Sequence, residues 1–205
     1  MLGFVSFKRY NVKVASAIER KIEMQVKRYE SQYAERVAKL LNEHLPFQEE
    51  NAQTVEQAGG VRYVYIDGEE VVGYIAGYEL QNSKEEMPYF EDELHEIHQA
   101  AQKKTTFYTS HLVVHPHYRG AGIGRSLVAA YMEKVAQIAD VLIAVGWVKS
   151  DTGKWDAEKL FAAFGLESFR YISQYFKPYK VYCPSCKSLC YCDAHIYWTE
   201  FAKHS

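Results

Sequence analysis

The chain has 205 residues, of which 48% are hydrophobic and 24% are charged, and this balance supports one folded domain with a core of its own. The formal net charge of -2 disfavours nucleic acid as a partner, because such surfaces normally carry a basic excess. The sequence lacks an apolar run of about 18 residues and a signal-peptide start, so we expect a cytoplasmic protein without a membrane partner.

The first part of the chain predicts a strand followed by helices. We expect the strand at residues 4–10. Over residues 14–44, apolar side chains recur at three- and four-residue spacing among charged ones, which predicts one or two amphipathic helices. These helices could pack on a sheet or on a second chain, so a homodimer stays open. Pro46 and the polar stretch 48–60 then end the helical region.

A hairpin and an acidic segment follow. Residues 61–66 and 71–80 predict two strands, with Asp67 and Gly68 supplying the turn between them. Residues 81–104 are polar and rich in carboxylates. This segment is either a solvated connector or a flap that faces the substrate, where its carboxylates would attract a cationic amine. The acidic residues concerned are Glu85, Glu86, Glu91, Asp92, Glu93 and Glu96.

The second half of the chain alternates strands and helices. Residues 105–114 predict a strand that leads through a glycine-rich turn into a helix at 124–137. The apolar run 141–145 predicts a strand buried on both faces and parallel to the previous one. A helix at 156–164 should end at Gly165, and strands are expected at 168–176 and 195–201.

The glycine-rich turn is suited to binding a phosphate. Gly120, Gly122 and Gly124 occupy alternate positions between the strand and the helix, and Arg119 adds a positive charge. The helix start offers unpaired amides and the positive end of its dipole. A dinucleotide-binding fingerprint would require glycine at Arg125, and a P-loop would require lysine there.

The pattern R-x-x-G-x-G from Arg119 to Gly124, after an apolar strand, resembles the pyrophosphate-binding loop of the GNAT superfamily of acyl-CoA-dependent N-acyltransferases. The order of predicted elements is also similar to that fold over about residues 4–201. The resemblance implies an α/β fold with a mixed central sheet, helices on both faces and a V-shaped opening at the acetyl-CoA site. We expect a single domain over residues 1–205, with a small cysteine-rich insertion at 182–195.

The resemblance also implies where acetyl-CoA, the co-substrate, would bind. Main-chain groups of Leu112 and Val114 would pair with the pantetheine arm, and amides of the glycine-rich turn would hold the pyrophosphate. The cofactor-binding residues implied are Leu112, Val113, Val114, Arg119, Gly120, Ala121, Gly122, Ile123, Gly124, Arg125 and Ser126.

The reaction implied is direct attack of a primary amine on acetyl-CoA, assisted by a base and by an acid for the leaving thiolate. The family commonly supplies the acid from a tyrosine, but the matching position here is Phe161. Another group or water would then protonate the thiolate, or the catalytic step is impaired. His111, whose pKa would lie near neutrality, is the first candidate for the base, and Glu79 is the second.

All four cysteines lie within ten residues, as Cys183, Cys186, Cys190 and Cys192. The first pair has the spacing of a zinc knuckle, and the four thiolates, or three with His195, would complete a structural zinc site. Disulfides and redox-active thiols are the alternatives.

These observations leave two hypotheses for the function. The first is an N-acetyltransferase that acts on an amine of unknown identity. The second is a catalytically weak acyl-CoA-binding or protein-interaction module that docks through its zinc loop. Release of free CoA distinguishes them.

Overall fold

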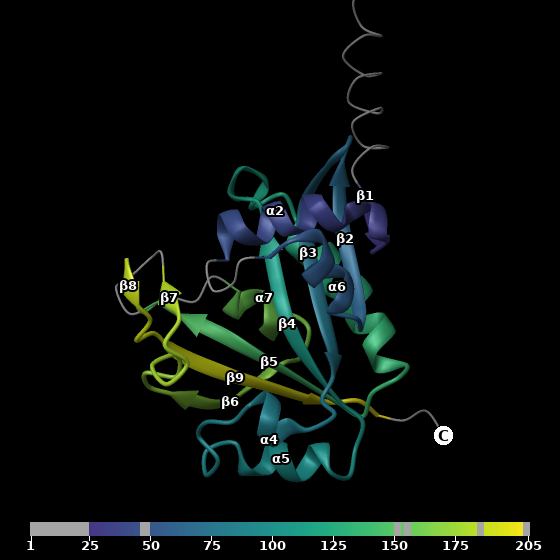
Figure 1. The fold of residues 1–205 in the computed structure, drawn as a ribbon. Helices are drawn as coiled ribbons and strands as arrows, with labels where there is room; N and C mark the ends of the chain where they lie inside the picture. Colours follow the sequence, from purple (N-terminus) through teal and green to yellow (C-terminus); the bar gives the residue numbers. More distant parts are fainter. Residues whose placement is uncertain (1–24, 46–49, 150–152, 154–156, 184–186, 203–205) are drawn as a thin grey trace, which may run out of the picture.

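The structure is a computed structural model, and it describes residues 25–45, 50–149, 153, 157–183 and 187–202 (Figure 1). The strand predicted at residues 4–10 lies outside this part of the chain. The helices are α2 (Ala34–His44), α3 (Ala52–Gln57), α4 (Ser83–Glu86), α5 (His95–Ala101), α6 (Ile123–Ala136) and α7 (Glu158–Ala162), with 3-10 turns η1 (Ser31–Tyr33) and η2 (Pro116–Tyr118). The strands are β1 (Gln25–Arg28), β2 (Val61–Asp67), β3 (Glu70–Glu79), β4 (Thr106–Val114), β5 (Val141–Val148), β6 (Glu167–Ile172), β7 (Tyr182–Cys183), β8 (Ser188–Leu189) and β9 (Asp193–Glu200).

A seven-stranded sheet, in the order β1-β2-β3-β4-β5-β9-β6, forms the centre of the molecule (Figure 1). The strands β4 and β5 are parallel, and every other neighbouring pair in this sheet is antiparallel. The helix α6 makes the connection that two adjacent parallel strands require. The prediction of a mixed α/β fold is therefore confirmed.

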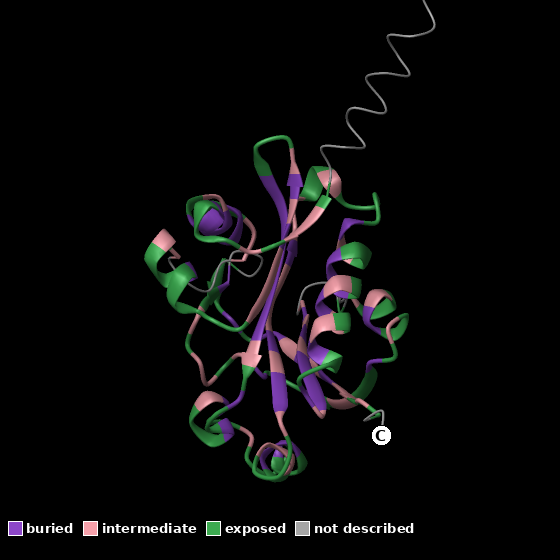
Figure 2. Ribbon diagram, turned by 90° about the vertical axis from the view of Figure 1, so that its right-hand side faces the viewer, coloured by how far each residue is buried: buried purple, intermediate pink, exposed green. Residues whose placement is uncertain are grey.

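Helices cover both faces of the sheet, as Figure 2 shows. Side chains alternate between the faces along each strand, so neighbours such as Leu142 and Ile143 belong to different core clusters. The first face packs against α6 and α7, through Leu127 and Phe161 among others. The second face packs against α2 near β2 to β4, and against the segment of α4 and α5 near β5 and β9.

The predicted helical region at 14–44 is partly wrong. Its end is helical, since α2 buries Val37, Leu40 and Leu41 against the sheet. Residues 25–28, however, form β1, which pairs antiparallel with β2, and residues 14–24 lie outside the described chain. The backbone pairing of β1 with a segment about 35 residues away outweighs the local helical periodicity.

Two further differences have local causes. The stretch 48–60 contains the short helix α3, which starts with a capping box in which Asn51 and Thr54 bond each other's backbone N–H. The strand predicted at 168–176 ends at Ile172, because the Asp193 carboxylate accepts a hydrogen bond from the Gln174 N–H at 2.7 Å and holds the chain in a turn. The other predicted strands and helices occur close to the predicted positions.

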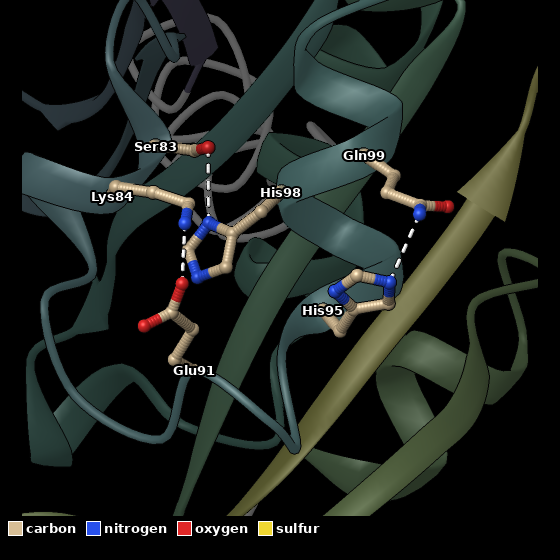
Figure 3. A network of polar contacts seen from close by, with 6 residues as sticks. All are labelled: Ser83, Lys84, Glu91, His95, His98 and Gln99. Carbon is tan, nitrogen blue, oxygen red and sulfur yellow. Dashed lines mark hydrogen bonds and ion pairs between the residues drawn. The ribbon is translucent and has the colours of Figure 1, made fainter.

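The acidic segment between β3 and β4 packs against β5 and β9 and carries a polar network, which Figure 3 shows. His98 of α5 is buried, and its Nδ1 lies 3.0 Å from the Ser83 hydroxyl of α4, while Lys84 forms an ion pair with Glu91. Most of its carboxylates are exposed, which fits the solvated connector.

None of the helices among the described residues is long and apolar enough to cross a membrane.

Candidate functional site

The glycine-rich turn lies at the start of α6. Gly120 and Gly122 have φ values of 80° and 82°, in the left-handed region that favours glycine, and Gly122 is the N-cap residue of α6. A Cβ at either position would meet no atom within 4 Å, so the turn is open outward. The first amides of α6 have no partner within the helix and face this opening. Tyr118 anchors the turn, because its hydroxyl donates to the Asp67 carboxylate at 2.9 Å.

The strands β4 and β5 separate beside this turn. Their parallel ladder runs from Thr106 opposite Val141 to Thr109 opposite Ala144, and the described ladder ends there. Beyond that point β4 stays paired with β3 and β5 stays paired with β9. The two strands therefore diverge in a V, which is visible in Figure 1.

Main-chain groups of β4 face this gap. The N–H of His115 donates to the carbonyl of Val72 on β3, and backbone direction alternates along a strand. The peptide groups of Leu112 and Val114 consequently point to the β5 side. The guanidinium of Arg119 lies there as well, since its Nε donates to the Val114 carbonyl at 3.2 Å. The resemblance implies that main-chain groups of Leu112 and Val114 pair with the pantetheine arm, and these groups are open to the gap.

A cavity of about 940 Å³ occupies the gap and reaches both faces of the sheet. On the α6 face it is lined by the glycine-rich turn and by Leu160 and Phe161 of α7. On the α2 face it is lined by Glu50 and by residues from α2, α4 and the segment after β6. These lining residues include Glu43, His44, Glu50, Glu86, Tyr175, Phe176, Tyr179 and Val181.

His111 lies in this cavity on the α2 face. In the pairing with β3, His111 is opposite Ala76 and Thr109 is opposite Gly77, so Ser110 is an extra residue and β4 bulges at this point. The His111 Nδ1 lies 3.0 Å from the Ser110 hydroxyl, and its ring centroid lies 6.3 Å from that of Tyr74. Burial lowers the pKa of His111 below the usual 6.5, and the Glu50 carboxylate opposes this effect. A neutral imidazole of this kind can accept a proton at pH 7.

Glu79, the second candidate base, lies elsewhere. It is exposed at the end of β3, opposite Phe107, and it is not among the residues that line the cavity. The structure therefore brings His111, but not Glu79, to the gap between the strands.

Two titratable groups near β4, His44 and Glu50, are among the cavity residues that were not predicted from the sequence. His44 ends α2, and its ring centroid lies 5.0 Å from that of His115, while Glu50 follows α2. Burial and the neighbouring His115 lower the pKa of His44. Neither residue belongs to a local motif. They reach the cavity because the topology places the end of α2 over β4.

A model of the acetyltransferase (GNAT) family matches residues 24–165, which is more than half of the chain. The chain belongs to the GNAT family. Solved structures with the same fold include the ribosomal-protein-S18-alanine N-acetyltransferase of Escherichia coli, with a TM-score of 0.60 and 11% identity over 89% of this chain and 96% of that one. Arabidopsis thaliana NAA60 in complex with a bisubstrate analogue gives a TM-score of 0.63 and 14% identity over 86% and 97% of the two chains.

Arabidopsis thaliana NAA60 in complex with acetyl-CoA gives a TM-score of 0.61, with 13% identity over 86% of this chain and 98% of that one. At such low identity these structures establish the fold of this GNAT protein and leave its substrate open. A search of curated proteins found no significant match.

This GNAT chain carries Phe161 where the resemblance expects a tyrosine. The Phe161 ring lines the cavity, and its edge packs against Tyr197, with the ring centroids 5.7 Å apart. A phenyl ring donates no proton, so the wall of the cavity lacks a hydroxyl at this position. The buried tyrosines of the other wall, Tyr108 and Tyr175, have pKa values raised by desolvation and are neutral at pH 7.

The cysteine-rich segment lies at the end of β5. Cys183, Cys190 and Cys192 are buried, and their sulfur atoms all lie within 4.8 Å of one another. Cys186 lies outside the described residues. His195, the alternative ligand, is not in this group, and its Nδ1 lies 3.1 Å from the Ser168 hydroxyl. Burial, with the neighbouring Cys192 and Cys183, raises the pKa of the Cys190 thiol.

Proposed function

We propose that this GNAT protein transfers an acetyl group from acetyl-CoA to a primary amine. The observation that carries the proposal is the gap between β4 and β5, which has a phosphate-binding turn at its mouth and a titratable His111 in its interior. Family membership supports the choice of acetyl-CoA, and solved relatives of the same fold include one in complex with acetyl-CoA.

In this proposal the two substrates approach the gap from opposite faces of the sheet. The amides at the start of α6 and the Arg119 guanidinium neutralise the pyrophosphate. The pantetheine arm lies between the strands. It pairs with the peptide groups of Leu112 and Val114 and so replaces the ladder partner that β5 no longer provides. The amine enters from the α2 face, the side on which His111 lies.

The chemical step is direct transfer. His111 accepts a proton from the ammonium form of the acceptor, and the freed nitrogen lone pair forms a bond to the thioester carbonyl carbon. The carbon–sulfur bond then breaks, the thiolate leaves, and the acylated nitrogen gives its second proton to a water molecule. Phe161 cannot protonate the thiolate, so water returns this proton to it, which a thiol pKa near 8.5 permits at a modest cost in rate.

The charge of the acceptor side favours an amine with a second positive charge. The carboxylates of Glu43, Glu50 and Glu86 line the cavity on the α2 face, and the Glu86 carboxylate is fixed by the N–H groups of Gln81 and Asn82 at 2.8 Å. Lys149, which directly follows β5, also lines the cavity and carries the opposite charge. A diamine would leave one ammonium group paired with these carboxylates while the other reacts.

The test is the release of CoA from acetyl-CoA in the presence of matched acceptors. We expect 1,4-diaminobutane to give a higher kcat/KM than butylamine, because both have the same reactive group and differ only in the second charge. A higher value for butylamine would contradict the acidic acceptor side.

A second function is favoured by Phe161 alone. A chain that binds acetyl-CoA but releases CoA at the uncatalysed rate with every amine would be an acyl-CoA-binding module. The zinc ion predicted from the sequence takes no part in the transfer, because a fully ligated ion has no open position for a substrate. Its proposed role is structural.

A further inference from the structure

The cysteine-rich segment has only a small core, in which Trp147, Phe176 and Val181 pack against three cysteine side chains. The hairpin of β7 and β8 has two residues in each strand, a size that is marginally stable alone in water. Two of its described side chains point outward, with Tyr182 57% exposed and Leu189 50% exposed. The three described cysteines are at most 1% exposed. A further cross-link is needed to hold such a segment in one conformation.

The geometry of the thiols suits one metal ion. Zinc bonds to thiolate at about 2.3 Å, so two ligands of a tetrahedral site lie roughly 3.8 Å apart. The three sulfur atoms of Cys183, Cys190 and Cys192 all lie within 4.8 Å of one another. Three converging sulfur atoms favour an ion over a disulfide, because a disulfide joins only two of them.

The same segment is tied to one wall of the cavity. The N–H of Cys190 donates to the Val181 carbonyl at 2.8 Å, and the N–H of Phe176 donates to the Cys192 carbonyl at 3.3 Å. Phe176, Val181 and Trp147 pack against the three cysteines, and all three also line the cavity. A single layer of side chains therefore separates the three thiols from the cavity.

This wall belongs to the acceptor side. Phe176 and the neighbouring Tyr175 and Tyr179 pack on the face of the sheet opposite α6. The glycine-rich turn lies at the start of α6, which packs on the other face of the sheet. Movement of the cysteine-rich segment would therefore change the acceptor side before it changes the phosphate-binding turn.

We infer that Cys183, Cys190 and Cys192 bind one structural zinc ion, and that this ion fixes the acceptor-side wall formed by Trp147, Phe176 and Val181. The identification of this wall as the acceptor side rests on the proposed function, whereas the zinc site and its effect on the wall do not. The fourth ligand is decided by experiment, because Cys186 lies outside the described residues.

The first test is the zinc content of the untagged full chain, purified without added metal and measured by mass spectrometry of the elements. We expect about one zinc ion per chain. The variants Cys183→Ser and Cys192→Ser should lose it. Leu189→Ser, which places the same new residue at an exposed position beside Cys190, should retain it. A folded wild-type chain without zinc, or full zinc content in both cysteine variants, would overturn the site.

The second test measures the wall itself by hydrogen exchange, and it keeps the inference testable if the cysteine variants fail to fold. Zinc is removed from the wild-type chain with a chelator. Amides of residues 175–181 should then exchange about tenfold faster or more, while amides of residues 120–127 keep their rates. Equal protection of 175–181 with and without zinc, or equal loss in both regions, would overturn the mechanical role.

Neither measurement depends on catalysis. A chain that passes both tests but acetylates no amine refutes the proposed function and leaves the zinc site intact. A wild-type chain that is isolated folded and without zinc, yet acetylates amines, refutes the zinc site and leaves the proposed function intact.

Discussion

Thr109 on β4 lies opposite Ala144 on β5, and this pair is the last in the described ladder between the two strands. Both strands continue beyond it with partners on their other edges, β4 as far as Val114 and β5 as far as Val148. The flanking strands therefore hold the gap open. We expect acetyl-CoA to bind there without rearrangement of the sheet.

The glycine at the N-cap of α6 should be needed for the cofactor more than for the fold. The substitution Gly122→Glu forces a side chain into the left-handed region, which costs about 1–2 kcal/mol, and adds negative charge to the glycine-rich turn. Gly68→Glu is the matched control, because Gly68 also has a positive φ of 59° and open space around it, but lies in the β2–β3 hairpin turn.

Thermal unfolding with and without acetyl-CoA measures this difference. We expect both variants to lose similar stability, and only Gly68→Glu to be stabilised by the cofactor, by about 2.7 kcal/mol at a hundred times its Kd. Stabilisation of Gly122→Glu by acetyl-CoA to the same extent would show that the turn does not hold the pyrophosphate.

His111 should act as the base, and its role should show in the pH profile. Burial lowers the pKa of His111 from 6.5, so the imidazole is neutral at pH 7 and becomes protonated only as the pH falls below that value. We expect kcat to fall with decreasing pH in that range, and His111→Gln to lower kcat by about a hundredfold or more.

Glu79→Gln separates the two candidate bases. Glu79 is exposed and outside the cavity lining, so this variant should keep the rate and pH profile of the wild type. A large loss of rate in Glu79→Gln together with normal rates in His111→Gln would reverse the assignment.

The close contact between β3 and α6 leaves no room for a side chain at Gly77. An added Cβ would lie 1.9 Å from the Tyr131 hydroxyl and 2.6 Å from the backbone oxygen of Tyr108. We expect Gly77→Ala to lower the free energy of unfolding by about 1–3 kcal/mol, measured by urea denaturation. Gly77→Ala with the stability of the wild type would mean that α6 packs further from the sheet.

The buried His98 should make the protein less stable in acid. Burial, together with the nearby Lys84, lowers the pKa of His98 below the unfolded value of 6.5. The unfolded chain therefore binds this proton more readily, so stability is complete above pH 6.5 and falls as the pH decreases towards the folded pKa.

The variant His98→Gln removes the imidazole that binds this proton in the unfolded chain. We expect the slope of unfolding free energy against pH below 6.5 to be smaller than in the wild type, by at most about 1.4 kcal/mol per pH unit. The half-buried His44 and His111 also have lowered pKa values and should account for a remaining slope. An unchanged slope in His98→Gln would contradict the account of this buried group.

Restoring a hydroxyl at Phe161 should have a limited effect. The thiolate of CoA is a good leaving group with a pKa near 8.5, so the acid is partly dispensable. We expect Phe161→Tyr to change kcat by less than about tenfold, measured by CoA release with the best amine of the screen. An increase of about a hundredfold would show that the missing acid limits this enzyme.

The strand, turn and helix from Thr106 to Ala136 could be predicted from the sequence, because glycine spacing and apolar periodicity are local signals. The strand β1 could not, since it is a strand only through its pairing with β2. His44 and Glu50 were missed for a similar reason. They reach the cavity through the packing of α2 over β4, which no local pattern records. The convergence of Cys183 with Cys190 and Cys192 was predictable, because a short hairpin connects them.

The most direct test of the central claim is a calorimetric titration of acetyl-CoA into the folded chain, purified without a chelator. The account predicts that the wild type binds one molecule per chain at micromolar concentration. Loss of this binding in Gly122→Glu would place the cofactor at the gap. Absence of binding by the folded protein would contradict the account, and the glycine-rich turn and the separation of β4 from β5 would then be structural features without a ligand.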